Sequence, residues 1–223
     1  MAFGNGPRII TDGLVLSLDT GDRNSYPGSG TVWNDMSGNG NNGTLTNGPT
    51  YSSTNGGSIV FDGSNDYIAT TYSPTFNDFS IIVWFKSTTK LTYDRIVDKN
   101  YVNGMWVGRN STIANSWGGG VIESSPPFGR FITLSDGSWH MIVSVRQGTT
   151  HTIYGDGITN NISGTVSSTA LSATAFAFGI NQSTGPNTDL FGGNIGSILI
   201  YNKALSSVEV LQNYNAQKSR FNL

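Results

Sequence analysis

Cysteine is absent from this chain of 223 residues, and charged residues are scarce, at 12% of the total. Without cysteine the fold contains no disulfide, and thiol catalysis and thiolate metal sites are excluded. The formal net charge of -2 gives the protein no general electrostatic attraction to nucleic acid or to anionic membranes. We therefore expect neither nucleic acid nor membrane as a partner.

Long apolar runs are also missing. No stretch approaches the roughly 18 consecutive apolar residues that a membrane-spanning helix needs. The opening sequence MAFGNGPRII lacks the basic region and apolar core that together make a secretion signal. We therefore expect the protein to fold in a cytoplasm and to reach any outside location by another route.

Glycine, by contrast, is abundant, at 29 residues, and turn-forming residues separate many short strand-like segments. The strongest strand is Phe79–Lys86, where Phe79, Ile81, Val83 and Phe85 share one face and Ile82 and Trp84 share the other. Apolar residues on both faces indicate a strand covered on both sides, as in the middle of a sandwich. The pattern predicts an N-terminal arm (1–12) followed by one all-β domain (13–223) built from two antiparallel sheets.

Two local features refine this prediction. Ser58–Asp62 and Tyr67–Thr70 resemble a hairpin around a turn at Gly63–Asp66. Near the C-terminus, Ser206 and Glu209 have the spacing of a helix capping box. The sequence predicts a short C-terminal helix, with an apolar stripe formed by Val208, Leu211 and Tyr214.

Several motifs occur in the order found in one superfamily. The segments SIVFDGSNDYIAT, FSIIVWFK, DGSWHMIVSVR, IYGDG and GNIGSILIYNKALSSVEV resemble laminin-G-like and pentraxin-like members of the concanavalin A-like lectin/glucanase superfamily. The resemblance implies a jelly-roll β-sandwich. The chain length, the entry GPRIITDG and the exit NYNAQKSRF also resemble small structural proteins of tailed phages, many of them cyanophage-like.

Catalysis is not expected. The glucanase branch that the chain resembles carries a tight Glu-x-Asp-x-(x)-Glu cluster, and glycoside hydrolysis normally needs two carboxyl groups flanking the bond. This chain has only Glu123 and Glu209, which are far apart in the sequence. His140 fits a packing or edge position, and His151 fits a solvated position after a turn. We predict a non-enzymatic protein.

Many relatives use calcium, a hard cation that needs several oxygen ligands at once, usually including two or more carboxylates. Asp62, Asn65 and Asp66 could supply ligands from one turn, although the same residues suit a plain turn. Pentraxins also need an acidic loop after the strand that corresponds to Ala175–Gly179. Here that loop offers Asn181, Gln182 and Asp189 without an acidic cluster. We therefore expect no cofactor, with one structural calcium left as an option.

Glycan binding without a metal needs an aromatic platform and polar groups. Trp117, in NSWGGG, is the best candidate for an exposed ring because glycine follows it. Trp33, Trp84 and Trp139 match positions that serve the core or the sheet edges in the family. The predicted ligand-binding set is completed by residues of nearby loops: Tyr101, Asn103, Trp106 and Asn115.

Two functions remain open. The first is a phage virion surface protein, either a capsid decoration protein or a tail appendage, whose partners are other virion proteins and whose location is the virion. Its glycine-containing arm could lie against a neighbour or fray, and a homo-oligomer would suit this role. The alternative is a lectin module that recognises cell-surface polysaccharide. In that case substitution of Trp117 should abolish glycan retention.

Overall fold

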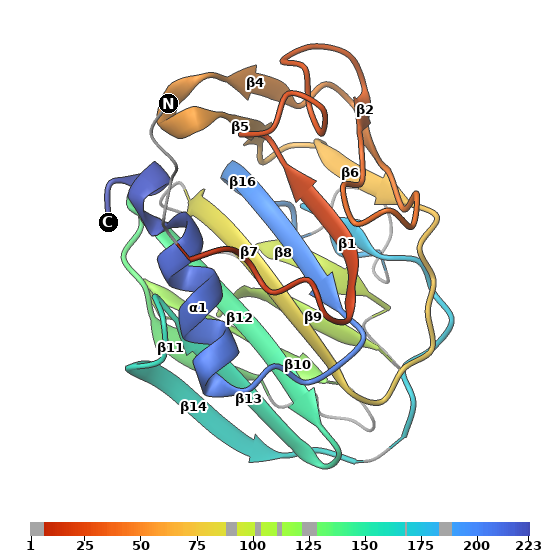
Figure 1. Ribbon diagram of the computed structural model, residues 1–223, viewed down its shortest axis with the longest axis vertical. Helices are drawn as coiled ribbons and strands as arrows, with labels where there is room; N and C mark the ends of the chain where they lie inside the picture. Colours follow the sequence, from red (N-terminus) through yellow and green to blue (C-terminus); the bar gives the residue numbers. More distant parts are fainter. Residues whose placement is uncertain are drawn as a thin grey trace.

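The computed structural model describes residues 7–87, 93–100, 104–110, 113–121, 129–167, 169–182 and 189–223. Two antiparallel β-sheets pack face to face around a hydrophobic core, and one α-helix lies on the outer face of one sheet (Figure 1). The predicted all-β sandwich of two antiparallel sheets with a C-terminal helix is therefore confirmed.

Each sheet has eight strands in the described part of the chain. Sheet A has the order β14-β13-β12-β7-β16-β5-β4, with β1 also paired to β16. Its strands are β1 (Leu14–Asp19), β4 (Thr50–Ser52), β5 (Ser58–Asp62), β7 (Phe79–Ser87), β12 (Trp139–Gln147), β13 (Thr150–Gly155), β14 (Asn160–Thr165) and β16 (Gly192–Tyr201).

Sheet B has the order β11-β10-β9-β8-β15-β6-β3-β2. Its strands are β2 (Val32–Trp33), β3 (Gly43–Thr46), β6 (Tyr67–Thr70), β8 (Arg95–Lys99), β9 (Met105–Arg109), β10 (Ser116–Val121), β11 (Arg130–Thr133) and β15 (Ala177–Phe178). The helical segments are η1 (Thr54–Gly56), α1 (Ser207–Gln217) and η2 (Lys218–Phe221).

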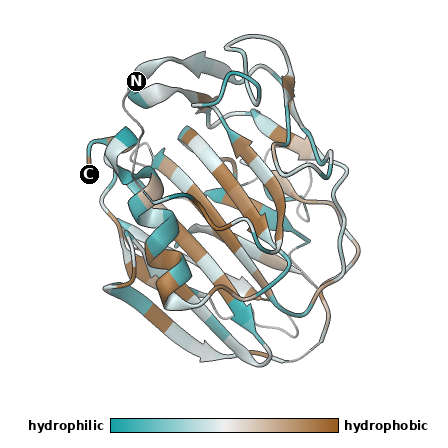
Figure 2. Ribbon diagram, in the orientation of Figure 1, coloured by the Kyte–Doolittle hydropathy of each residue, from teal (hydrophilic) through white to brown (hydrophobic). Residues whose placement is uncertain are grey.

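Strand β7 lies between β12 and β16 in sheet A, and both of its faces are covered as predicted. Phe79, Ile81, Val83 and Phe85 belong to the core between the sheets. Ile82 and Trp84 belong to a second apolar cluster on the outer face, under the C-terminal helix. Figure 2 shows apolar residues recurring along these central strands. The apolar residues on the two faces of β7 therefore belong to two separate packing surfaces.

Helix α1 begins with the predicted capping box. The Glu209 amide donates to Ser206 Oγ at 3.3 Å, and the Ser206 amide donates to Glu209 Oε2 at 2.8 Å. The predicted stripe is wrong at Val208, whose side chain faces solvent and is 72% exposed. The buried residues of α1 are Val210, Asn213 and Gln217. Asn213 and Gln217 can be buried although they are polar, because each accepts a hydrogen bond from the rest of the domain.

The predicted hairpin of Ser58–Asp62 with Tyr67–Thr70 is also wrong. Strand β5 pairs with β4 and β16 in sheet A, whereas β6 pairs with β3 and β15 in sheet B. The intervening turn therefore carries the chain from one sheet to the other. Asp66 is buried at this corner, and its Oδ2 accepts a hydrogen bond of 2.9 Å from the Asp62 amide.

The second half of the predicted N-terminal arm lies against helix α1. The Ile10 amide donates to Asn213 Oδ1 at 2.9 Å, and Gln212 Nε2 donates to the Arg8 carbonyl at 2.8 Å. Residues 1–6 lie outside the described residues. No helix in the described part of the chain has the length and hydropathy needed to cross a membrane.

Candidate functional site

The outer face of sheet B carries a hollow between strands β6 and β15. Ile68 and Phe178 point into the core and are fully buried, so the residues that alternate with them lie on the outer face. There Ala69 of β6 is the register partner of Ala177 of β15, and Ala177 is in turn the partner of Asp98 of β8. Two neighbouring alanines leave room where larger side chains would fill the surface.

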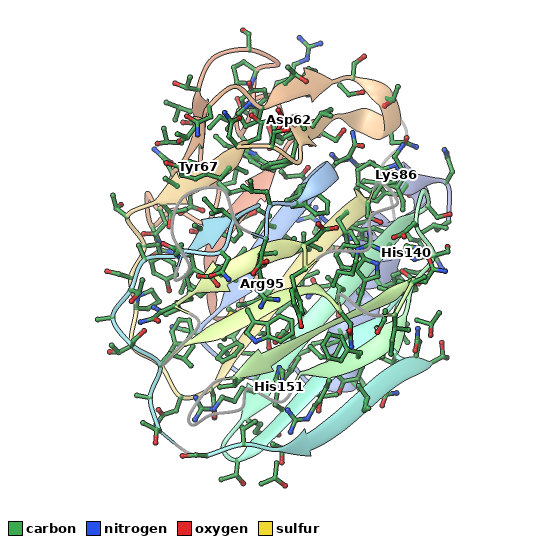
Figure 3. All side chains as sticks on the ribbon, turned by 180° about the vertical axis from the view of Figure 1, so that it is seen from behind. Asp62, Tyr67, Lys86, Arg95, His140 and His151 are labelled. Carbon is green, nitrogen blue, oxygen red and sulfur yellow. The ribbon has the colours of Figure 1, made fainter. Side chains whose placement is uncertain are left out.

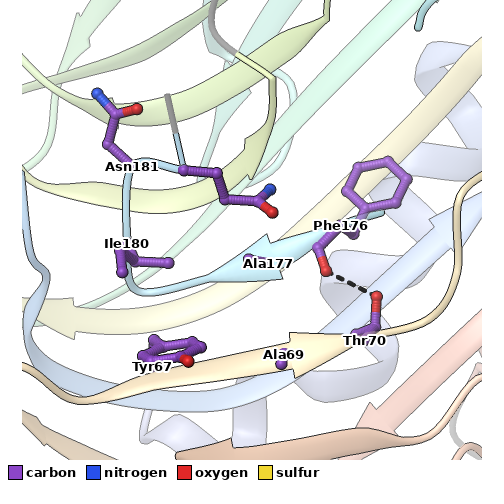
Figure 4. A pocket seen from close by; sticks show the side chains of 8 residues that line it. Tyr67, Ala69, Thr70, Phe176, Ala177, Ile180 and Asn181 are labelled. Carbon is purple, nitrogen blue, oxygen red and sulfur yellow. Dashed lines mark hydrogen bonds between the residues drawn. The ribbon is translucent and has the colours of Figure 1, made fainter. Parts of the chain in front are cut away.

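An open pocket of about 420 Å³ occupies this hollow (Figure 4). This volume lies within the range of about 300–1,000 Å³ that is typical of small-molecule sites. Strands β6 and β15 and the segment after β15 form its walls. The lining residues are Tyr67, Ala69, Thr70, Phe176, Ala177, Ile180, Asn181 and Gln182. Figure 3 shows this face of the molecule, with Tyr67 and Arg95 on it.

The polar wall of the pocket is fixed by hydrogen bonds. Gln182 Nε2 donates to the carbonyl oxygens of Asp98 and Ala175, both at 3.0 Å. Asn181 Nδ2 donates to Asp189 Oδ2 at 2.7 Å. The carbonyl oxygen of the Gln182 side chain accepts no hydrogen bond from the described residues. It is therefore a positioned acceptor for a ligand hydroxyl.

Asp98 lies behind this wall and is fully buried. Its Oδ1 accepts hydrogen bonds from the Asn100 amide at 3.2 Å and from Gln182, whereas its Oδ2 has no hydrogen-bond partner in the described structure. Burial raises the pKa of Asp98, and the hydrogen bonds from Gln182, the positive charge of Arg95 and the hydrogen bond from the Asn100 amide offset only part of this effect. The carboxylate therefore places a negative potential behind the wall whenever it is ionised.

The neighbouring Lys99 points to the other face of β8. Its Nζ donates to the Thr174 carbonyl and lies 5.2 Å from the centroid of the Phe176 ring, which belongs to the core. Burial lowers the pKa of Lys99 to about 8. The Lys99 amino group thus lies in the interior of the sandwich and not on the face that carries the pocket.

The prediction of an exposed Trp117 is wrong. Trp117 and the glycines that follow it lie in strand β10 (Ser116–Val121) instead of a loop, and the fully buried Trp117 ring packs between the sheets. Its ring centroid lies 4.6 Å from that of Phe85 and 4.4 Å from the Arg109 guanidinium carbon. The following glycines allow close strand packing, because a Cβ on Gly118 would lie 1.8 Å from the Arg130 carbonyl oxygen. The ring is not accessible to a glycan.

Of the other predicted ligand-binding residues, Trp106 and Asn115 are described by the structure, and neither contacts Trp117 through a hydrogen bond or ring contact. Trp106 lies on the opposite, outer face of sheet B, where the Arg95 guanidinium covers it at 4.0 Å from the ring centroid, and it is 4% exposed. Asn115 holds a turn by accepting a hydrogen bond of 2.9 Å from the Asp136 amide. Tyr101 and Asn103 lie outside the described residues.

The acidic turn predicted as a calcium option forms hydrogen bonds of its own. Asp62 Oδ1 accepts from the Ser64 amide at 2.7 Å and from the Asn65 amide at 3.3 Å, which is the pattern of a side-chain-supported turn. Asp66 is engaged with the Asp62 amide, as described above. No group of three histidine or acidic side chains with metal-binding geometry occurs among the described residues. The geometry favours the turn interpretation, and calcium binding stays a prediction.

His151 is not solvated, contrary to the prediction. It shares the inward face of β13 with Ile153, is fully buried and contacts Ser144 Oγ at 2.8 Å and Arg130 at 3.3 Å. Burial, together with the charges of Arg130 and Arg146, lowers the pKa of His151 to about 3. The imidazole is therefore a neutral interior group at physiological pH.

The remaining catalytic candidates from the sequence have structural partners. His140 lies on the interior strand β12, and its Nδ1 lies 2.7 Å from Asp156 Oδ2, so of the two predicted alternatives the packing position fits and the edge position does not. The Glu209 carboxylate caps α1 and contacts Lys203 at 2.8 Å. Glu123 lies outside the described residues. None of these described groups lines the pocket of sheet B.

Sequence reasoning missed the floor and one wall of the pocket, namely Ala69, Ala177 and Tyr67. The alanines become neighbours only through pairing of strands that are distant in the sequence, so no local pattern marks them. The loop containing Asn181 and Gln182 was considered only as the counterpart of the acidic calcium loop of pentraxins, and its lack of an acidic cluster argued against that site.

Solved structures with this fold share little sequence with the chain. The binding domain of Paraclostridial Mosquitocidal Protein 1 is 17% identical, with a TM-score of 0.72, over 92% of this chain and 52% of that one. Domain 4 of AbnA, a GH43 extracellular arabinanase from Geobacillus stearothermophilus in complex with arabinotriose, is 19% identical, with a TM-score of 0.66, over 94% and 100%. Trypanosoma rangeli sialidase in complex with sialic acid is 14% identical, with a TM-score of 0.67, over 93% and 33%.

These similarities establish the fold alone. The chain spans about half the length of the mosquitocidal binding domain, a third of the sialidase and all of the arabinanase domain. No curated protein matches the sequence at a significant level. The profile of the concanavalin A-like lectin/glucanases superfamily matches residues 62–211, which include the whole pocket lining. The chain therefore belongs to the concanavalin A-like lectin/glucanase superfamily.

Proposed function

We propose that this chain is a non-enzymatic, lectin-like module that binds a glycan in the pocket of sheet B. The observation that carries the proposal is the pocket itself, in which Tyr67 and the hydrogen-bonded amide of Gln182 stand over a floor made by two alanines. Membership of the superfamily supports it. So does the likeness over nearly the whole chain to an arabinanase domain that was solved with arabinotriose.

The residues at the pocket suit the mixed surface of a sugar. The Tyr67 ring is partly exposed and offers an aromatic face and a hydroxyl group. The side-chain oxygen of Gln182 can accept from a sugar hydroxyl, and its position is held by hydrogen bonds to β8 and to Ala175. Because this acceptor is held in place before binding, less conformational entropy is lost when the ligand arrives.

Glycan-array binding followed by calorimetric titration of the best oligosaccharide tests this proposal. We expect Tyr67→Ala to weaken binding about tenfold or more, because the substitution removes one wall of the pocket. Ile162→Ala is the control, since Ile162 is 40% exposed on β14 of the other sheet. Equal binding by Tyr67→Ala and the native protein would contradict the proposed site, and no binding to any glycan would contradict the proposed function.

The virion surface role stays a prediction, and it is compatible with glycan binding, since a decoration protein or tail appendage can also be an adhesin. Mass spectrometry of purified particles, with a copy-number estimate, tests it. A high copy number is expected for a capsid component and a low one for a tail appendage. Absence from particles would contradict the virion role and leave the lectin role standing.

A further inference from the structure

We propose that the pocket of sheet B selects neutral glycans over anionic ones, and that Asp98 is the residue that sets this selectivity. This inference rests on the proposed function and specifies its ligand class. It follows from the side chains that line the pocket, from the charges immediately behind them and from the positions of the nearest cations.

Among the residues that the structure describes, no charged side chain lines the pocket. Its polar groups come from Tyr67, Thr70, Asn181 and Gln182, all neutral, and the other four lining residues are apolar. Recognition of a carboxylate or sulfate usually involves a guanidinium, an ammonium or several converging amide donors. Here the amide nitrogens of Gln182 and Asn181 already donate to protein oxygens. The lining therefore suits hydroxyl groups better than an anion.

The charges behind the pocket wall are negative. Gln182 Nε2 contacts Asp98 Oδ1 at 3.3 Å, and Asn181 Nδ2 contacts Asp189 Oδ2 at 2.7 Å. Asp98 is fully buried, so little water lies around its carboxylate to screen its field. Gln182 and Asn181 thus each contact a carboxylate. An anionic ligand group seated against this wall would be repelled.

The two cationic side chains of β8 lie outside the pocket lining. The Arg95 guanidinium lies 4.0 Å from the ring centroid of Trp106 and 5.8 Å from that of Tyr93. Lys99 points into the core, where it donates to the Thr174 carbonyl. Neither side chain lines the pocket. Arg95 offsets part of the charge of Asp98 from outside the pocket, but neither Arg95 nor Lys99 presents a cation to a ligand inside it.

The size of the effect can be set by Coulomb's law. For a ligand carboxylate about 8 Å from Asp98 at an effective dielectric constant of about 20, repulsion weakens binding by about thirtyfold without salt and by about threefold with physiological screening. We therefore expect the native protein to prefer the neutral member of a matched glycan pair by about three- to thirtyfold. The preference should increase as the salt concentration falls.

The experiment compares binding to matched neutral and sialylated or uronic acid-containing oligosaccharides. Asp98→Asn keeps the shape of the side chain and removes its charge, so the ratio of acidic to neutral binding should rise about threefold or more. Gln182→Lys places a cation on the exposed wall without altering the core and should raise the same ratio. Asp12→Asn is the control for net charge, because Asp12 is 83% exposed and pairs with Lys203 beside α1.

The outcomes separate this inference from the proposed function. Neutral preference in the native protein, reduced by both pocket variants and unchanged in Asp12→Asn, would support the inference. Preference for the acidic member, or ratios that neither pocket variant changes, would overturn the inference while glycan binding stands. Absence of binding to every glycan would contradict the proposed function and overturn the inference with it. Thermal melting of each variant verifies that the protein is folded.

Discussion

The outer face of sheet A is covered by other parts of the chain, whereas the outer face of sheet B is open. The outer face of sheet A is closed by the C-terminal segment, in which the Trp84 ring stacks 5.6 Å from Tyr214 and 4.4 Å from Phe221. Trp84 Nε1 also donates to Gln217 Oε1 at 2.9 Å. The outer face of sheet B instead has alanines at its centre and an open pocket above them.

The difference shows how one architecture separates stability from binding. Large rings on sheet A bury apolar area and hold the helix, so that face contributes to the free energy of unfolding. Small side chains on sheet B contribute little packing but leave space for a ligand. Substitutions on the two faces should therefore have different effects, the first mainly on stability and the second mainly on binding.

Removal of the Trp84 ring should have the largest effect on stability, because this ring is central to the closed outer face of sheet A. Trp84→Ala is expected to lower the free energy of unfolding by about 3–5 kcal/mol, because the substitution deletes a fully buried side chain and leaves a cavity under α1. Urea denaturation measures this change. Val208→Ala on the exposed side of the same helix should change stability by less than about 0.5 kcal/mol. A small effect of Trp84→Ala would contradict the assigned role of the closed face.

Low pH should reduce the free energy of unfolding, because a buried histidine in the core between the two sheets must then remain unprotonated. The pKa of His151 is lowered to about 3, below its unfolded value of about 6.5, so the unfolded chain binds a proton first as the pH falls. The stability contribution is complete above about pH 6.5 and is lost between pH 6.5 and 3, at up to about 1.4 kcal/mol per pH unit. Denaturation at a series of pH values should show a shallower dependence for His151→Gln. Identical slopes would contradict the buried neutral imidazole.

Loss of the helix cap should have a smaller effect on the closed face. Ser206→Ala removes the acceptor for the Glu209 amide and should cost about 1 kcal/mol of stability. Thermal denaturation provides the measurement, and Ser207→Ala, one position inside the helix, serves as the control. Glycan binding should be unchanged, since the cap lies on the sheet opposite the pocket. Loss of binding in Ser206→Ala would show that the two faces are coupled.

Filling the pocket should have the smallest effect on stability and a large effect on binding. Ala69→Leu adds side-chain atoms on the outer face of sheet B, beside its register partner Ala177 on the neighbouring strand. We expect a stability change below about 1 kcal/mol and a loss of affinity of about tenfold or more. Calorimetric titration and a thermal melt measure the two quantities on the same sample. Unchanged affinity in the folded variant would place the ligand elsewhere.

The fold could be predicted because its signals are local. Alternation along Phe79–Lys86 and the capping box at Ser206 and Glu209 each lie within a few residues, and the structure confirms both. The partner of each strand could not be predicted in the same way. For this reason β5 and β6 were expected to form a hairpin, although they lie in different sheets.

The site was harder to predict because composition gave a misleading signal. Glycine beside Trp117 suggested an exposed loop, but glycine also permits close contact between strands, and the ring is buried. The pocket floor depends on Ala69 and Ala177, whose small size is informative only once they are known to be neighbours. Asn181 and Gln182 both line the pocket, but from the sequence their loop was considered only for a calcium site, and binding of a ligand by their amides was not predicted.

The most direct test of the account is a backbone NMR titration of the native protein with the oligosaccharide that binds most tightly on the array. We predict that the largest amide shift changes will occur at Tyr67–Thr70 and at 176–182, on β6, β15 and the following segment. Amides of α1 should remain unchanged. Shift changes centred on α1 or on the turn at Asp62–Asp66, with none around Tyr67 and Gln182, would contradict the proposal that the open face of sheet B is the binding face.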